Sequence, residues 1–217
     1  QIPITIAGIT EVTNPESSYG GYDEETDESL LKRYLDDVQK PATSNNIYQF
    51  EKWAKEVAGV GKAKVFPTWN GNNTVKVVIT NYSMLTADSS LVSKVQEYID
   101  PIGPAKWGKG YGKAGLGSYC TVVSAIGKTI NISVGVNISS NYTLTQIRYS
   151  IMEAVGKYFQ EIAFHETINF VSYAKISALI INIEGVMDIL SLTLNGTTGN
   201  IILGAEEIPI LGTVTVT

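Results

Sequence analysis

Few residues in this sequence have the types and spacing that catalysis or metal binding requires. His165-Glu166 begins like a zinc-protease helix, but the fifth position is Asn169 and the chain contains no second histidine. That type of site needs two imidazoles one helical turn apart on the same ion. The acidic run 23–28 places Glu28 where a calcium loop requires glycine. We therefore expect no metal ion and no cofactor, and we interpret the acids as the first turn of a helix.

Nucleophilic and phosphate-binding chemistry are equally poorly supported. Gly127-Lys128-Thr129 matches the end of a phosphate-binding loop, but Val122 stands where that loop begins with glycine. The flanking residues are typical of strands, so a hairpin turn is the better interpretation. Cys120, the single cysteine, lies in the strand-like segment SYCTVVS and is predicted to be a buried thiol. We expect no catalytic residues and no enzyme, although a carboxylate-pair hydrolase stays open because sequence does not show which acids converge.

Size and charge narrow the class of protein further. The 217 residues suit one large domain or two small ones. Sixteen basic and 21 acidic side chains give a net charge of −5, and the basic residues are scattered along the chain. Because phosphate binding needs a concentrated positive surface, we expect no nucleic-acid partner. No apolar run approaches the roughly 20 residues that cross a bilayer, so we expect no membrane insertion.

The amino-terminal half contains clear helix and hairpin signals. After the acidic run, apolar residues recur at helical spacing until Pro41 ends the pattern. A second helix is predicted from Asn46, which with Gln49 has capping-box spacing. Gly59 and Gly61 end that helix, and Asn70-Gly71 predicts a hairpin between two strands. The predicted apolar stripes are Leu30, Leu31, Tyr34, Leu35 and Val38, then Ile47, Phe50, Trp53, Ala54 and Val57; the strands are 63–69 and 74–80.

The carboxyl-terminal half repeats this mixture of elements. Asp88 or Ser89 caps a helix that ends at Asp100-Pro101. Thr143 and Gln146 form a second capping-box pattern. The predicted strands are 119–125, 129–138, 189–194, 201–203 and 208–216, the first two turned at 126–128, and the helical stripes fall within 91–99, 147–162 and 176–183.

These elements predict an α+β fold of two small modules, each with helices packed on a short, mostly antiparallel sheet. The first module spans 19–102 and the second spans 119–217, with a Gly-rich loop or linker at 103–118 between them. Residues 1–18 are interpreted as a connector strand from a missing amino-terminal region. EVAGV and IEGV each precede a strand and an Asn-Gly pair. This echo is either an internal duplication of a helix–Gly-Val–hairpin unit or two independent solutions to the same connection.

Long ordered strings in the chain resemble the baseplate J-like family of contractile phage tails and related injection machines. They are DEETDESLLKRYL, KPATS, YQFEKWAKEVAGVGKAKVFPTWNG with TVKVVI, and then YAKISALIINIEGV, LTLNG and IPILGTVTV. The resemblance implies a structural wedge protein of a phage or phage-tail-like baseplate, assembled in the bacterial cytoplasm, that contacts other wedge proteins and further copies of itself. We expect the isolated fragment to be monomeric or weakly associating. The alternatives are a tail-associated cell-wall hydrolase and a receptor- or carbohydrate-binding module.

Three aromatic residues are the candidate partner contacts. Trp69 is predicted at a hairpin tip, and Trp107 and Tyr111 lie in the Gly-rich loop. Large aromatic side chains at such places are poorly covered by their own module and are favoured at subunit contacts. Each tryptophan can equally pack back onto its own module.

Overall fold

The computed structural model describes residues 26–39, 41–43 and 45–217. The chain divides into two units, with the boundary after Pro41. The described part of the first unit is helix α1 (Asp27–Gln39), which has Asp27 and Glu28 in its first turn, as predicted. The predicted connector strand at 1–18 and the acids at 23–25 lie outside the described residues.

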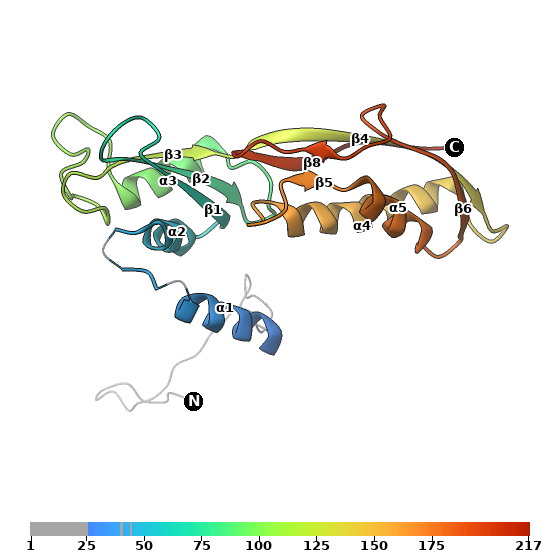
Figure 1. The fold of residues 1–217 in the computed structure, drawn as a ribbon, viewed down its shortest axis with the longest axis horizontal. Helices are drawn as coiled ribbons and strands as arrows, with labels where there is room; N and C mark the ends of the chain where they lie inside the picture. Colours follow the sequence, from blue (N-terminus) through green and yellow to red (C-terminus); the bar gives the residue numbers. More distant parts are fainter. Residues whose placement is uncertain (1–25, 40, 44) are drawn as a thin grey trace, which may run out of the picture. The chain divides into compact units, whose positions relative to one another are not determined.

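The second unit begins with an α+β module whose three-stranded sheet has the order β1-β2-β3 (Figure 1). Strand β2 pairs antiparallel with β1 and parallel with β3, the chain crossing between β2 and β3 through α3. The elements are α2 (Ile47–Glu56), β1 (Val60–Pro67), β2 (Thr74–Asn81), α3 (Ser89–Ile99) and β3 (Tyr119–Ser124).

Local chemistry sets the boundaries of these elements. The side chain of Asn46 accepts a hydrogen bond from the backbone N–H of Gln49, and Asp88 accepts one from Leu91, so each caps a helix as predicted. Gly59 has φ +102°, a left-handed conformation that lets the chain turn from α2 into β1. The predicted hairpin between β1 and β2 is confirmed.

A second module follows, with a sheet of order β6-β4-β8 and a small pair β5-β7. Its central strand β4 pairs antiparallel with β6 and parallel with β8. Helices α4 and α5 lie along one side of this sheet (Figure 1). The elements are β4 (Ile126–Ile138), α4 (Leu144–Ile162), β5 (Phe170–Val171), α5 (Tyr173–Ile181), β6 (Val186–Leu194), β7 (Ile201–Ile202) and β8 (Glu207–Val216).

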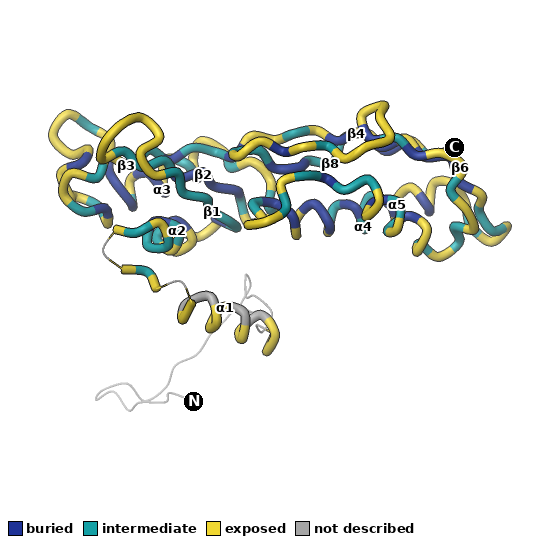
Figure 2. The backbone as a smooth tube through the Cα atoms, viewed as in Figure 1, coloured by how far each residue is buried: buried dark blue, intermediate teal, exposed yellow. Residues whose placement is uncertain are grey.

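Alternation of apolar and polar residues explains how β4 is buried on one face only. Ile130, Ile132 and Val134 are buried, whereas Asn131 and Ser133 between them are exposed. The capping box predicted at Thr143 is present and starts α4. The buried face of that helix meets the sheet (Figure 2) through Ile147, Ile151, Val155, Tyr158, Phe159 and Ile162.

The α+β class is confirmed, but the two three-stranded sheets are mixed, with one antiparallel and one parallel pairing each. The predicted hairpin between residues 119–125 and 129–138 is wrong. Strand β3 pairs with β2, and Gly127-Lys128 lies inside β4. The chain passes from the first sheet to the second at Ala125. Strand β3, which starts at Tyr119, therefore belongs to the first module and not to the second, where it was predicted. The physical reason is that the helix α3 crossover returns the chain parallel to β2, which local turn signals do not reveal.

The Gly-rich segment 103–118 joins α3 to β3 within the first module and does not link the two modules. Ala114 is buried, and its N–H donates to the carbonyl of Ile99 at 2.8 Å. Gly108 has φ +69°, and a Cβ there would collide with the ring of Tyr119. Glycine is therefore required here for close packing as well as for turning.

The suspected duplication extends only to the helix–Gly–Val corner. Gly185 has φ +93° and leads from α5 into β6, as Gly59 leads from α2 into β1. However, β6 pairs with β4 and not with the strand that follows it. Asn195-Gly196 does form a tight turn, closed by a bridge between Leu194 and Thr197, but the next strand, β7, pairs with β5. The hairpin is thus not repeated.

Candidate interaction surfaces

Trp69, predicted at a hairpin tip, lies in the loop between β1 and β2 and is 42% exposed. The ammonium of Lys76 lies 4.3 Å from the centre of its ring. This cation–π contact fixes the ring against the sheet while leaving part of it open to solvent. Trp69 therefore remains a candidate contact, and it is held in place by a charge.

Trp107 and Tyr111 occupy the Gly-rich loop but differ in how they are held. The Trp107 indole N–H donates to the carbonyl of Cys120 at 2.9 Å, and its ring packs edge-on against Tyr119 at 5.2 Å. Trp107 thus packs back onto its own module, although 39% of it stays exposed. Tyr111 is 68% exposed and is the more accessible of the two.

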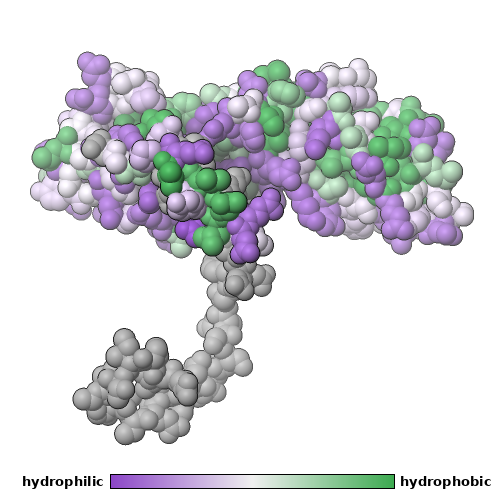
Figure 3. Space-filling model, turned by 60° about the horizontal axis from the view of Figure 1, so that its bottom comes forward, coloured by the Kyte–Doolittle hydropathy of each residue, from purple (hydrophilic) through white to green (hydrophobic). Residues whose placement is uncertain are grey.

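Two further sets of apolar side chains are exposed. The first is the predicted stripe of α1, whose members Leu30, Leu31, Tyr34, Leu35 and Val38 are all exposed. The second lies on α5 and β6 in the second module, in the region where Figure 3 shows apolar residues gathering on the right, and includes Ile181, Met187 and Leu190. Contiguous exposed apolar residues mark interaction surfaces.

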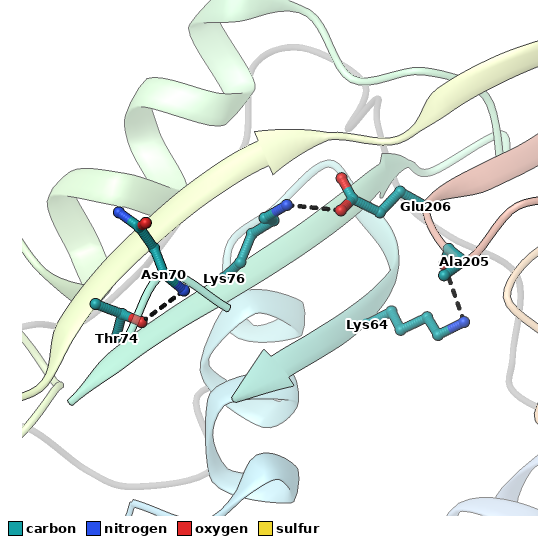
Figure 4. A network of polar contacts seen from close by, with 6 residues as sticks. All are labelled: Lys64, Asn70, Thr74, Lys76, Ala205 and Glu206. Carbon is teal, nitrogen blue, oxygen red and sulfur yellow. Dashed lines mark hydrogen bonds and ion pairs between the residues drawn. The ribbon is translucent and has the colours of Figure 1, made fainter. Parts of the chain in front are cut away.

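Lysines of the first sheet reach across to the second module. The ammonium of Lys62 on β1 donates to the backbone carbonyls of residues 160, 161 and 163 at the end of α4, at 3.4, 3.1 and 2.7 Å. Lys64 donates to the carbonyl of Ala205 at 3.0 Å, and Lys76 on β2 pairs with the Glu206 carboxylate at 2.6 Å (Figure 4). We call Lys62, Lys64 and Lys76 the junction lysines.

The rest of the junction consists of a shared strand line and a small apolar seam. Strands β3 and β4 follow each other directly on either side of Ala125, whose N–H donates to Ile79 in the first sheet. The N–H of the next residue, Ile126, donates to Glu206 in the second module. The buried residues of the seam are Val78, Ala125, Ala163 and Ile208, with Phe66, Met84, Val123 and Phe164 packed around them.

A shallow cavity of about 370 Å³ lies beside this junction, and its lining includes Lys64, His165, Glu166 and Glu207. Glu207 accepts the N–H of Gly204 and pairs with Lys128, and these contacts hold the pKa of its carboxyl below the ordinary value. A carboxyl with a lowered pKa is poorly suited to act as a general acid. Nδ1 of His165 is 3.3 Å from the N–H of Thr167. Among the described residues, no group of three or more His, Cys, Asp or Glu side chains is placed to hold a metal ion.

Two buried ionisable groups lie on the other side of the first sheet. Burial, with a smaller contribution from Asp100, raises the pKa of the Cys120 thiol to about 12, which confirms the predicted buried thiol. Burial also raises the pKa of Asp100, although hydrogen bonds from the N–H groups of Cys120 and Gly108 act in the opposite direction. Neither group lines the cavity described above. Within the described chain, no helix combines the length and apolarity needed to span a bilayer.

Sequence reasoning missed the junction lysines. Their signal is the alternation Lys62, Lys64, Phe66, which places these three side chains on the same face of β1, opposite the face that packs on α2 and α3. Lysines on one face of a strand usually indicate that this face is exposed to solvent. Only the fold reveals that hydrogen-bond acceptors from the second module cover this face of β1.

The comparisons with known proteins agree with this two-module organisation. Residues 42–124 match the baseplate J-like central domain, and residues 130–217 match the baseplate J-like protein C-terminal domain. The change of sheet at Ala125 falls between the two matches. The chain therefore belongs to the baseplate J-like family.

Several individual proteins are similar to this chain. The phage-like element PBSX protein XkdT of Bacillus subtilis (strain 168) is 39% identical over 97% of this chain and 59% of its own length. Baseplate protein gp47 of Escherichia phage Mu is 40% identical over 43% of this chain and 28% of its own length. A chain of the anti-feeding prophage baseplate shares the fold, with a TM-score of 0.55 at 13% identity, over 89% of this chain and 43% of that one. The chain thus spans 59% of the Bacillus relative and a smaller part of the other two.

Proposed function

We propose that this chain is part of a structural baseplate protein of a contractile phage tail or phage-tail-like particle. In this role it links neighbouring baseplate subunits and passes their rearrangement on to sheath contraction. The observation that carries the proposal is the family match, which runs through both modules and includes a relative named as a baseplate protein. Its partners are other wedge proteins and further copies of the same protein, and it assembles in the bacterial cytoplasm.

The exposed stripe of α1 supports a role in assembly. A helix with five exposed apolar side chains on one face is stabilised by packing that face against another element. In the proposed function a neighbouring baseplate subunit supplies that element. Trp69, Trp107 and Tyr111 are proposed as further contacts, with Tyr111 the most accessible of the three.

An enzymatic role lacks comparable support. The shallow cavity contains a single imidazole, and its Glu207 is held by Lys128 and Gly204. A peptidoglycan zymogram of the full-length protein distinguishes the two classes. We expect no clearing, and a cleared band that is lost on His165→Ala would replace the structural proposal with a hydrolase.

Deletion of the gene in the bacterium that produces the particle tests the proposal directly. We expect tails without baseplates by negative-stain electron microscopy, restored by the full-length wild-type gene. Leu31→Glu puts a charge into the α1 stripe and should not restore them, whereas Gln39→Glu at the end of the same helix should. Normal particles after deletion would contradict the proposed function, and normal particles with Leu31→Glu would remove α1 from the contact.

A further inference from the structure

The junction between the two modules is built differently from the two cores that it joins. Its apolar seam has four buried residues, compared with twelve in the first core and seventeen in the second. Because apolar burial is the main stabilising contribution within each module, the seam contributes much less free energy than either core. Polar contacts from the junction lysines must therefore supply much of the attachment.

Lys62 makes the most specific of these contacts. The last carbonyls of an α-helix have no partner within the helix, and the helix dipole makes that end negative. An ammonium group has three N–H donors, and that of Lys62 meets three carbonyl oxygens at the end of α4. A strand of one module thus caps a helix of the other, and the cap is lost if the modules separate.

Lys64 and Lys76 act on a second segment of the second module. Lys64 reaches the carbonyl of Ala205, and Lys76 reaches the carboxylate of Glu206, just before β8 begins. The Lys76 and Glu206 side chains are only 15% and 29% exposed, so solvent screens this pair less than a surface pair. The junction lysines therefore contact both the end of α4 and the segment just before β8. The backbone passes from the first module to the second at Ala125.

We propose that the junction lysines form a latch that holds the two modules as one lever and releases them at Ala125 before either module unfolds. Local opening occurs where little apolar surface is buried and the hydrogen bonds are partly exposed, and the junction meets both conditions. With the latch closed, a force on one module turns the other. With it open, the modules move separately about the β3–β4 connection. The role in a tail rests on the proposed function, whereas the latch itself is a property of the isolated chain.

Spin labels on the two modules test the latch. The exposed residues Tyr111 and Tyr149 are replaced by cysteine and labelled, while Cys120 stays buried and protonated. Pulsed electron paramagnetic resonance should give one narrow distance distribution for this protein and a clearly broader one after Lys62→Met and Lys76→Met together. Lys128→Met is the matched control, because the Lys128–Glu207 pair lies within the second module. It should leave the distribution narrow.

Hydrogen exchange measured by mass spectrometry supplies the second readout. In the double variant the amides of Ala125 and Ile126 should exchange faster by on the order of tenfold, while those of Val77 and Ile132 in the cores should not change. If the double variant unfolds a module, Glu206→Gln removes the same ion pair from the other side and should broaden the distribution to a smaller extent. Equal distributions and exchange in the junction variants and in Lys128→Met would overturn the latch and leave the baseplate role untouched.

Discussion

The two modules share a sheet layout but close it in different ways. In each, a central strand has one antiparallel and one parallel neighbour, and a helix enters the antiparallel edge through a Gly-Val corner. In the first module the parallel edge strand β3 is covered by side chains that pair with its backbone. In the second module a larger apolar cluster packs between the helices and one face of the sheet. Small apolar cores can thus be completed by a polar network.

Gln96 on α3 shows how this network works. Its side-chain amide donates to the carbonyl of Cys120 at 3.0 Å and accepts the N–H of Val122 at 2.7 Å, as a peptide group of a fourth strand would. Asp100 accepts N–H groups of Cys120 and Gly108, and Trp107 donates to the same Cys120 carbonyl. The outer edge of β3 is therefore occupied and is closed to pairing with another strand.

In the second module two tyrosine hydroxyls form hydrogen bonds with the backbone. The Tyr158 hydroxyl accepts the N–H of Ser172, and the Tyr173 hydroxyl donates to the carbonyl of Leu192. Its remaining buried contacts are between aliphatic and aromatic side chains of α4, α5 and the sheet. Apolar packing is the main stabilising contribution in both modules, and in the first module buried side-chain hydrogen bonds to β3 add to it.

The largest expected effect comes from opening a cavity in the apolar core. Ile151→Ala should destabilise the second module by about 2–5 kcal/mol, because Ile151 is fully buried and the surrounding side chains cannot refill its space. Tyr149→Ala on the exposed face of the same helix is the control. All three tryptophans belong to the first module, so tryptophan fluorescence reports only on that module. Hydrogen exchange in urea should therefore show faster opening of the second module, while the fluorescence stays native. If the native fluorescence is lost at the urea concentration at which the second module unfolds, the two modules unfold together.

Removing the side-chain amide of Gln96 should lower the free energy of unfolding of the first module by nearly as much. Gln96→Leu keeps the volume but leaves the buried N–H of Val122 without its acceptor, which we expect to destabilise this module by about 2–4 kcal/mol. The unfolding midpoint in urea, followed by tryptophan fluorescence, measures the effect. Glu97→Leu at the next, exposed position should change stability by less than about 0.5 kcal/mol. Equal midpoints for the two variants would show that the amide is not required.

Asp100 should give the first module a pH dependence opposite in sign to the one that Glu207 gives the second module. Its pKa is raised in the folded state, so the folded protein binds the proton more tightly than the unfolded chain does. Its contribution to stability is full below the ordinary carboxyl pKa and is lost as the pH rises through the raised value. Urea midpoints between pH 4 and pH 7, followed by fluorescence, should show this slope, and Asp100→Asn should abolish it. An unchanged slope in the variant would assign the pH dependence to other carboxyls.

The smallest expected effect is on the reactivity of the Cys120 thiol. Labelling of this thiol reports whether the edge of β3 is covered, and it needs no substitution in the wild-type protein. With a pKa of about 12 and a buried sulfur, the thiol should not react with iodoacetamide at pH 8 in the native protein and should react within minutes in urea. Gln96→Leu should speed native labelling, whereas Ile151→Ala in the other module should not. Rapid labelling of the native wild type would contradict the closed edge.

Local signals in the sequence correctly predicted the helices and their caps. Asn46, Asp88 and Thr143 each accept the backbone N–H three residues later, and the stripes of α2, α3 and α4 are the buried faces. Ile47 at the start of the predicted α2 stripe is the exception, because it is exposed. The other features depend on residues within one or two turns of each other, so the sequence contains the information they need. The aromatic contact candidates were placed correctly in loops, but the hydrogen bond that ties Trp107 to Cys120 was not predictable from spacing.

By itself the sequence determined the α+β class, the positions of the caps and corners, the burial of Cys120 and the resemblance to baseplate J-like proteins. The tertiary structure alone decided that β3 pairs with β2, that the chain changes sheet at Ala125, and that Gln96 and the junction lysines meet groups far along the chain. The physical reason is the separation in sequence between the residues that interact. A cap or a turn is fixed by neighbours in sequence, whereas strand partners and cross-module hydrogen bonds depend on how whole elements pack.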